Sequence, residues 1–342
     1  MIKYRLKPKH LSTTLLFVLI LLSSCTPEPS WIKNEGGIFG TSYHIIYQSP
    51  DGKDLHADLK AALDSVNRSL STYDSTSVIS QFNKSSRGTI MDDHFRTVFF
   101  TAQKVTEKTE GAFDMTVAPL VNAWGFGFTG QEKVARDKTD SLKSLVGMDQ
   151  IEIQDDSLIK HKPGIMLDAS AIAKGYGSDV AAKVLERNGC ERYMVEIGGE
   201  VVTKGKNSRN GPWRLGIDRP IDDPTASKRE LELVVELSGQ ALATSGNYRQ
   251  FYVDEETGKK YSHTIDPSTG RPVDHTLLSA SVVAPSCMLA DAYATAFMVM
   301  GHQKSLEIIK KHPELEGCFI FDSKDGMKVE WTEGFEQYVS AH

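Results

Sequence analysis

A stretch near residue 291 carries an acid and a hydroxyl at a spacing suited to holding a cation. In "DAYATA" (291–296), Asp291 and Thr295 are four residues apart in an otherwise apolar segment, so a helix places both on one face. A carboxylate there is costly unless it is paired or binds a metal. Two such oxygens, a backbone carbonyl and phosphate oxygens would suit Mg²⁺. The alternative is a hydrogen-bonded Asp291, with Thr295 bonding the carbonyl four residues earlier.

A histidine occupies a position suited to proton transfer. "YSHTIDPSTGRPV" (261–273) reads as a strand that runs into a D-P-x-T-G turn, with His263 near the end of the strand. From there a side chain can project into a cleft, and histidine is the commonest general base near neutral pH. A structural histidine remains the alternative.

The segment "LDASAIAKGYGSDVAAKVL" (167–185) combines small residues with Asp168 and Lys174 before a helix. It is not a dinucleotide fingerprint, because Val180 stands where the third glycine would fall. It is not a phosphate loop either, since Lys174 precedes its glycine. The free amide groups of a helix start beside a cation still suit an anion. Small side chains equally suit close approach of a ligand or of a second backbone, and both readings stay open.

Aromatic residues follow a predicted helix in "EGAFDMTVAPLVNAWGFG" (110–127), which also contains Asp114 and Asn122. The rings of Trp124 and Phe126 could stack on a planar ligand, or could belong to the core. Two further turns that bear glycine and many hydrogen-bond donors occur at 196–201 and 243–251.

The hydrophobic patterning outlines the elements that must position these residues. Helical spacing is predicted over 54–70, 92–111, 173–188 and 287–301, with a short surface helix within 129–145. Strands are predicted within 39–48, 151–168, 192–205, 213–220, 231–246, 249–267, 277–285 and 317–335. Because strands come in pairs rather than in alternation with helices, we expect an α+β fold with mixed or antiparallel sheets flanked by helices, in one large body.

The first residues have the composition of an export signal. Four basic residues precede the apolar stretch "LSTTLLFVLILL" (11–22), which is too short to span about 30 Å of hydrocarbon. "LSSC" resembles the bacterial lipobox, which implies that Cys25 becomes lipid-modified; an ordinary cleavage site is the alternative. We expect a signal peptide at 1–24, a lipid-anchored tether at 25–35 and a catalytic domain at 36–342, anchored to a membrane and facing the periplasm.

Charge and cysteine content narrow the classes of function. The formal net charge of −6 becomes −10 once the leader is removed, which disfavours nucleic acid as a partner. Cys190, Cys287 and Cys318 remain, with no C-x-x-C spacing. We therefore expect neither a structural zinc site nor a disulfide framework, although one disulfide is permitted outside the cytoplasm.

Taken in order, the motifs are similar to those of a known family. G-A-F-D (111–114), D-A-S-A-I-A-K-G-Y (168–176), I-G-G-E (197–200), S-G-N-Y (245–248), S-H-T-I-D-P-S-T-G-R-P (262–272) and D-A-Y-A-T-A (291–296) follow one another. Each is weak alone, but the six in this order, behind a lipobox, resemble the ApbE-type FAD:protein FMN transferases from about Gly36 to Gly334. The resemblance implies an α+β body related to the T-fold.

The resemblance also implies site residues. Ligands of Mg²⁺ would be the side chains of Asp291 and Thr295 and the backbone carbonyl of Ala171. His263 would be the catalytic base. Phe39 stands where the family commonly has Met, and Glu196, in place of a frequent Asn, adds a negative charge near the diphosphate. Contacts to FAD are implied at Phe39, Ala112, Phe113, Asp114, Asp168, Lys174 and Ile265.

By the same resemblance, FAD is a substrate whose FMN half moves to a Thr or Ser hydroxyl of another protein, with release of AMP. The flavin subunits of membrane redox complexes would be typical acceptors. This chain lacks the acceptor pattern D-x-x-[ST]-[GS]-A-[ST], so we expect an exported protein as acceptor. Two alternatives stay open, namely a Mg²⁺-dependent FAD pyrophosphatase that yields FMN and AMP and a non-enzymatic flavin-binding lipoprotein.

Overall fold

The computed structural model describes residues 28–129, 139–221, 230–248, 251–253, 258 and 260–340. The predicted leader and Cys25 lie outside these residues. Within them, one eight-stranded sheet organises the chain, in the order β1-β2-β6-β7-β10-β15-β16-β17. Its strands are β1 (Ser30–Ile38), β2 (Thr41–Ser49), β6 (Tyr193–Ile197), β7 (Glu200–Lys204), β10 (Ala241–Gly246), β15 (Leu277–Ala284), β16 (Glu316–Ser323) and β17 (Gly326–Trp331).

Every pairing within this sheet is antiparallel. The sequence of β2 suits such a sheet. Buried and less buried side chains alternate along this strand, so that one face packs on the core. The α+β class with helices flanking antiparallel sheets is confirmed.

The start of the folded body differs from the expected boundary. Residues 30–35, assigned to the tether, belong to β1, which pairs with β2 along its whole length from Ser30 opposite Ser49. The Trp31 ring packs edge-on against Trp213, 6.1 Å away, and the Arg192 guanidinium lies 4.9 Å from the same ring. These contacts partly bury an aromatic residue that had been assigned to the tether.

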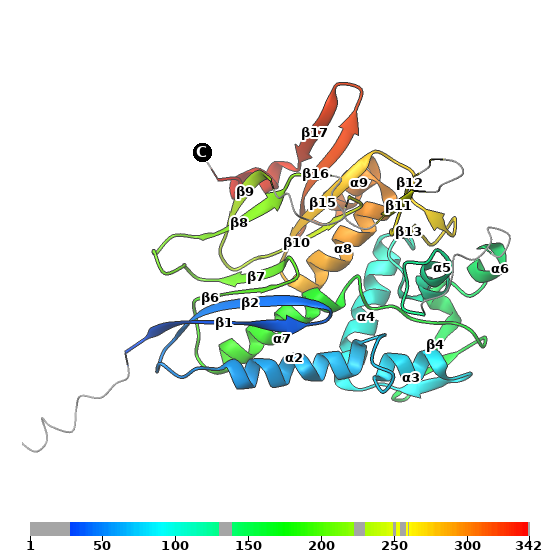
Figure 1. Ribbon diagram of the computed structural model, residues 1–342, viewed down its shortest axis with the longest axis horizontal. Helices are drawn as coiled ribbons and strands as arrows, with labels where there is room; N and C mark the ends of the chain where they lie inside the picture. Colours follow the sequence, from blue (N-terminus) through cyan, green and yellow to red (C-terminus); the bar gives the residue numbers. More distant parts are fainter. Residues whose placement is uncertain are drawn as a thin grey trace, which may run out of the picture.

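Helices pack against this sheet and against each other. α7 contacts α2, α8 and the strands β6 and β7, while α8 contacts β10, β15 and α4. In Figure 1, α7 and α2 lie together below β1 and β2, and α8 rises through the middle of the molecule. The helices are α2 (His56–Leu70), α3 (Val78–Lys84), α4 (Asp93–Lys108), α5 (Ala118–Ala123), α6 (Thr139–Lys143), α7 (Ala173–Arg187), α8 (Cys287–Met300) and α9 (His302–Lys311).

Smaller sheets extend the body. Three strands pair in the order β3-β5-β4, and the pairs β8–β9, β11–β12 and β13–β14 are antiparallel hairpins. They are β3 (Gly88–Ile90), β4 (Ile151–Gln154), β5 (Ser157–Lys160), β8 (Trp213–Asp218), β9 (Leu231–Leu237), β11 (Phe251–Val253), β12 (Lys260–Ser262), β13 (Ile265–Asp266) and β14 (Arg271–Pro272). Within the described residues, short 3₁₀ helices span Met115–Val117, Met148–Gln150 and Glu333–Tyr338.

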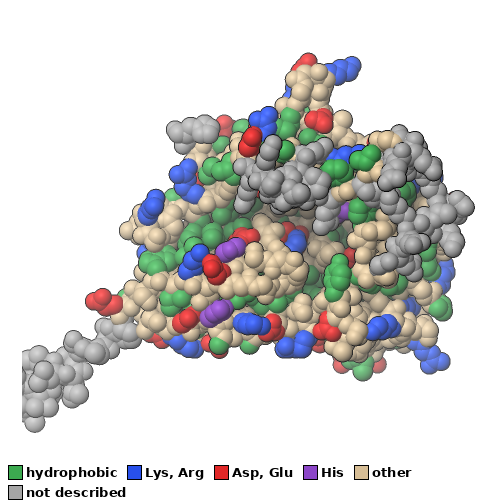
Figure 2. Space-filling view, in the orientation of Figure 1, with side chains coloured by type: hydrophobic (Ala, Val, Ile, Leu, Met, Phe, Trp, Pro, Cys, Tyr) green, Lys and Arg blue, Asp and Glu red, His purple; other side chains and the backbone are tan. Residues whose placement is uncertain are grey.

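Among the longer described helices, α8 is the most apolar, because it lies between the sheet and other helices. Most of its side chains are buried, including the carboxylate-bearing Asp291, which is 2% exposed. No described helix is long and apolar enough to cross a bilayer. The three described cysteines, Cys190, Cys287 and Cys318, are buried and unpaired. On the face shown in Figure 2, described acidic and basic side chains are interspersed.

Candidate active site

One cavity of about 650 Å³ collects segments that are far apart in the sequence. Its walls come from the β1–β2 turn, the segment after α4, the start of α7, the start of β7, β10, the β12–β13 segment and α8. All eleven site residues implied within the described chain line it: Phe39, Ala112, Phe113, Asp114, Asp168, Ala171, Lys174, His263, Ile265, Asp291 and Thr295.

The β1–β2 turn delivers Phe39 to the cavity. Ile38 pairs with Thr41, which leaves Phe39 and Gly40 as a two-residue loop, and both have positive φ, at 52° and 74°. This is the backbone of a type I′ hairpin turn, which matches the twist of the strands. The Phe39 ring packs over Gly177 of α7, where an added Cβ would lie 2.4 Å from a ring carbon. A glycine in that helix thus makes room for the hairpin tip.

The end of α4 positions the G-A-F-D segment. Gly111 N–H donates to the Thr106 carbonyl at 2.9 Å, and Glu110 and Gly111 both have positive φ. Asp114 then accepts from the backbone N–H of Thr116 at 2.7 Å and from its hydroxyl at 2.5 Å, which caps the following 3₁₀ helix. Burial raises the pKa of Asp114, and these hydrogen bonds oppose that shift. Asp114 therefore has two places in the structure: it stabilises the start of the 3₁₀ helix, and it lines the cavity.

A turn before α7 shapes the adjoining wall. Asp168 accepts the backbone N–H of Ser170 at 2.8 Å, and its own N–H donates to the Met115 carbonyl at 2.8 Å. The first bond forms an Asx-type turn, and the second ties this segment to the one that carries Asp114. It also brings Ala171 to the cavity.

The first turn of α7 differs from the anion site expected there. The N–H of Gly175 donates to Asp291 Oδ2 at 2.9 Å, and the N–H of Ala173 donates to the Ala169 carbonyl at 2.8 Å. The acceptor of the Gly175 amide is therefore the Asp291 carboxylate of the same chain. The segment packs closely on a second backbone, and because it also lines the cavity, the approach of a ligand stays a prediction. An added Cβ at Gly175 would lie 2.3 Å from the Cys287 carbonyl oxygen.

The start of α8 is held by an acid from α7. Asp179 accepts the N–H groups of Cys287 and Met288, each at 2.9 Å, while Ser286 caps Leu289 N–H at 3.3 Å. Burial raises the pKa of Asp179 to about 6, and the two N–H donors oppose the shift. These bonds fix the helix one turn before Asp291.

The surroundings of Asp291 fit a hard cation. Its Oδ1 lies 3.8 Å from Lys174 Nζ, beyond hydrogen-bonding distance. Thr295 follows one turn later, with Oγ1 3.2 Å from the hydroxyl of Ser245 rather than on its own helix. Ala171 lines the same cavity. The described residues contain no group of three His, Cys, Asp or Glu side chains that could hold a metal. Donors here would be one carboxylate, hydroxyls and a carbonyl, which suit Mg²⁺ when phosphate completes the set.

Lys174 bridges two buried carboxylates. Its Nζ lies 2.5 Å from Glu200 Oε1. Burial disfavours the ammonium charge, but Asp291 and Glu200 together raise the pKa of Lys174. Burial also raises the pKa of Glu200, and Lys174 opposes this. The lysine therefore keeps its proton. Its side chain is 29% exposed and lines the cavity, where a diphosphate would meet a cation.

The segment with His263 lies just beyond a strand rather than within one. β12 ends at Ser262, so His263 occupies the bend before β13. Its ring is half-buried, lines the cavity and lies edge-on to Phe126, with centroids 6.4 Å apart. A bend at a cavity wall gives an imidazole access to a bound hydroxyl, as a general base needs.

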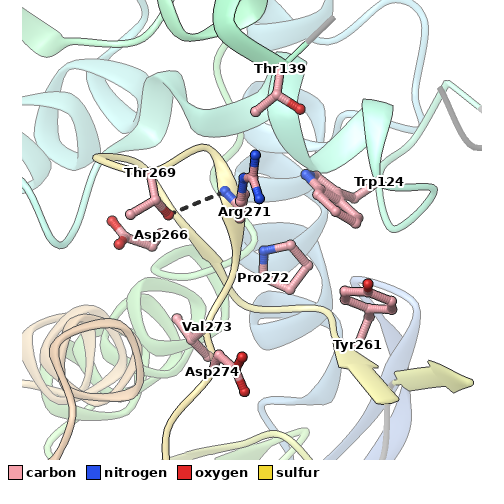
Figure 3. A pocket seen from close by; sticks show the side chains of 9 residues that line it. All are labelled: Trp124, Thr139, Tyr261, Asp266, Thr269, Arg271, Pro272, Val273 and Asp274. Atoms are coloured by element: carbon pink, nitrogen blue, oxygen red, sulfur yellow. Dashed lines mark hydrogen bonds between the residues drawn. The ribbon is translucent and has the colours of Figure 1, made fainter. Parts of the chain in front are cut away.

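A second, smaller cavity of about 320 Å³ is lined by residues on either side of His263 in the sequence, among them Tyr261 and Asp266. Figure 3 shows the side chains of Trp124, Tyr261 and Arg271 around it. The Trp124 and Tyr261 rings lie 5.5 Å apart, and Trp124 Nε1 donates to the Gly270 carbonyl at 2.9 Å. Trp124 is thus outside the larger cavity and fastens the D-P-x-T-G turn that follows Ile265.

Two acids near the I-G-G-E turn, Glu196 and Glu200, lie in different surroundings. Glu196 does not line the cavity; it contacts His44 Nδ1 at 2.6 Å and accepts Gly199 N–H at 2.7 Å. Glu200, which had no assigned role, lines the cavity and is 3% exposed. A charged residue opening an apolar strand, directly after Gly-Gly, was the signal that could have identified it.

Comparisons with known proteins agree with the convergence of these motifs. The model of the ApbE family matches residues 39–319. An FAD:protein FMN transferase from Vibrio cholerae is 37% identical over 330 residues, covering 94% of this chain and 97% of the relative. One from Haemophilus influenzae is 36% identical, covering 92% and 94%. The solved structure of the flavin transferase ApbE from Vibrio cholerae superposes with a TM-score of 0.81 at 36% identity, covering 91% of this chain and all of that one.

Proposed function

The chain belongs to the ApbE family of flavin transferases, and from this membership we propose a specific activity for it. It is a Mg²⁺-dependent FAD:protein FMN transferase that attaches FMN through a phosphoester to a Thr or Ser of another protein and releases AMP. The observation that carries the proposal is the convergence of eleven implied residues, from five separate segments, on one cavity.

The chemistry follows from the residues in that cavity. An imidazole nitrogen of His263 takes the proton of the acceptor hydroxyl while the hydroxyl oxygen bonds to the FMN phosphorus. The phosphoanhydride bond to the AMP phosphate breaks, and AMP leaves with the bonding electrons. The ammonium of Lys174 faces the diphosphate and neutralises part of its charge. Asp291, Thr295 and the Ala171 carbonyl would hold Mg²⁺, which supplies further neutralisation of that charge.

The acceptor and the place of the reaction are part of the proposal. The leader and the lipobox-like "LSSC" support an enzyme anchored through Cys25 to a bacterial membrane and facing the periplasm. An exported protein with a flavin-attachment Thr or Ser, such as a flavin subunit of a membrane redox complex, would be the acceptor.

An assay with FAD, Mg²⁺ and a Thr-bearing acceptor domain tests the activity. We expect covalent flavin fluorescence on the acceptor in a denaturing gel, abolished by EDTA. Asp291→Ala should lower the rate by roughly 100-fold or more, since it removes a group that stabilises transition-state charge. Free FMN without labelled acceptor would support the pyrophosphatase instead. FAD binding without turnover would support a flavin-binding lipoprotein.

A further inference from the structure

The buried acid Glu200 has a position that the proposed reaction does not explain. It opens β7 directly after Gly198 and Gly199, and Ser178 Oγ donates to its carbonyl oxygen at 3.0 Å. Its side chain is 3% exposed and lines the cavity. Oε1 contacts Lys174, whereas Oε2 is buried and has no hydrogen-bond partner among the described residues. A carboxylate oxygen left in this state is costly, so a purely structural account of Glu200 is incomplete.

Glu200 and Asp291 compete for the same ammonium. Lys174 Nζ is 2.5 Å from Glu200 Oε1 but 3.8 Å from Asp291 Oδ1. The aliphatic part of the Lys174 side chain passes close to Gly198, because its Cδ lies 3.3 Å from where a Cβ on that glycine would be. Glu200 thus holds the ammonium beyond hydrogen-bonding distance of the Asp291 carboxylate.

That separation matters for a cation. In a direct ion pair, the Lys174 ammonium would contact the same Asp291 oxygen that a divalent cation would bind, and would repel that cation. At an effective dielectric constant of about 20, moving an ammonium roughly 1 Å closer to a carboxylate strengthens their attraction enough to change a binding constant about tenfold. The geometry therefore bears on metal affinity and not only on the binding of diphosphate.

We propose that Glu200 is a positioning residue that keeps the Lys174 ammonium off the Asp291 carboxylate and so keeps that carboxylate open for a divalent cation. The inference rests on the proposed function, because it takes Asp291 as a cation ligand. It assigns to Glu200 a role in metal affinity that acts through Lys174 and not through direct ligation.

Binding of Mn²⁺ alone, measured from the free-ion signal in electron paramagnetic resonance, tests this without turnover. Asp291→Asn should abolish binding at the site and so assign the signal. Glu200→Gln should raise the Mn²⁺ dissociation constant about tenfold. Lys174→Met combined with Glu200→Gln should restore it to within about threefold of wild type, because the competing ammonium is gone. This double variant also removes both charges together, which a buried pair tolerates better than loss of one partner.

Two further variants complete the design. Glu196→Gln is the matched control, since that acid lies on the neighbouring strand, outside the cavity, and Mn²⁺ binding should not change. If Glu200→Gln does not fold, Glu200→Asp keeps the charge but shortens the side chain, and should weaken binding several-fold.

Three outcomes overturn the proposal. The first is unchanged Mn²⁺ affinity in the Glu200 variants. The second is equal loss in Glu200→Gln and the double variant, because Glu200 would then not act through Lys174. In both of these the wild-type site still binds metal and the proposed function stands. The third is wild-type protein that takes up no Mn²⁺, which removes the premise and the metal part of the proposed function as well.

Discussion

His263 and Asp291 face the same cavity in opposite kinds of surroundings. The imidazole of His263 is half-buried at a bend, where an acceptor hydroxyl can reach it. The carboxylate of Asp291 is 2% exposed and is held by the Gly175 amide at 2.9 Å. A base that exchanges protons needs access, whereas a cation ligand gains from low dielectric and fixed geometry. In the proposed reaction, these two environments would separate proton transfer by His263 from charge neutralisation at Asp291.

Replacing His263 by Ala should lower the rate of FMN transfer by about 10²–10⁴-fold, the usual contribution of a general base. FAD affinity, measured from quenching of flavin fluorescence, should remain within about threefold, because Lys174 and the cavity walls are untouched. His161→Ala is the control, since that side chain is 50% exposed and outside the cavity. An equal loss of FAD affinity and rate would assign His263 to binding instead.

At the scale of elements, the cavity exists because α7 and α8 approach closely. Gly175 permits the contact with the Cys287 carbonyl and donates to Asp291. Asp179, one turn later on α7, caps the start of α8. Helix periods alone predicted both helices, because each buries an apolar face. They could not predict that these helices meet, since that contact joins residues more than a hundred positions apart.

Gly175→Ala should destabilise the fold, although Ala is normally favoured over Gly in a helix by about 1 kcal/mol. The added methyl meets backbone at 2.3 Å, and overpacking of this kind typically costs about 1–3 kcal/mol. We expect a lower midpoint in urea unfolding and weaker Mn²⁺ binding, because Asp291 is displaced. Arg187→Ala, on the exposed side of α7, should change neither. A more stable Gly175→Ala protein would contradict the packing account.

Asp179 predicts a pH dependence of stability. Its pKa rises from 3.8 to about 6 in the folded state, mainly through burial. The folded protein then binds more protons than the unfolded chain between these values, so the stability from this group is complete below about pH 4 and is lost as pH rises towards 6. Urea unfolding from pH 4 to 7 should show a steeper fall for wild type than for Asp179→Asn. Parallel curves for the two proteins would refute this assignment.

For the whole molecule, local sequence patterns predicted the fold class and the segments that line the cavity. They did not predict which residues far apart in the sequence contact each other. Glu200 shows the limit most clearly. Its motif was visible, but its contact with Lys174 depends on β7 lying beside α7, which no local pattern states. Ser30–Ile38 shows another: its strand depends on pairing with β2 and on the contact between Trp31 and Trp213.

The anchor is also a prediction for the whole chain. If Cys25 is lipid-modified, the full-length protein should partition with the membrane fraction of a bacterial host, since acyl chains bind bilayers in proportion to their length. Cys25→Ala should shift the protein to the soluble fraction or leave the leader uncleaved. Cys190→Ala, a buried cysteine in the folded body, serves as the control. Membrane partition of Cys25→Ala with a cleaved leader would exclude this mode of anchoring.

The most direct test of the account is a crystal of the protein with FAD and Mn²⁺, with the metal located by its anomalous scattering. We expect one strong peak in contact with the Asp291 carboxylate, the Thr295 hydroxyl and the Ala171 carbonyl, with the diphosphate of FAD between that peak and Lys174. A metal peak elsewhere, or a diphosphate bound outside this cavity, would contradict the account.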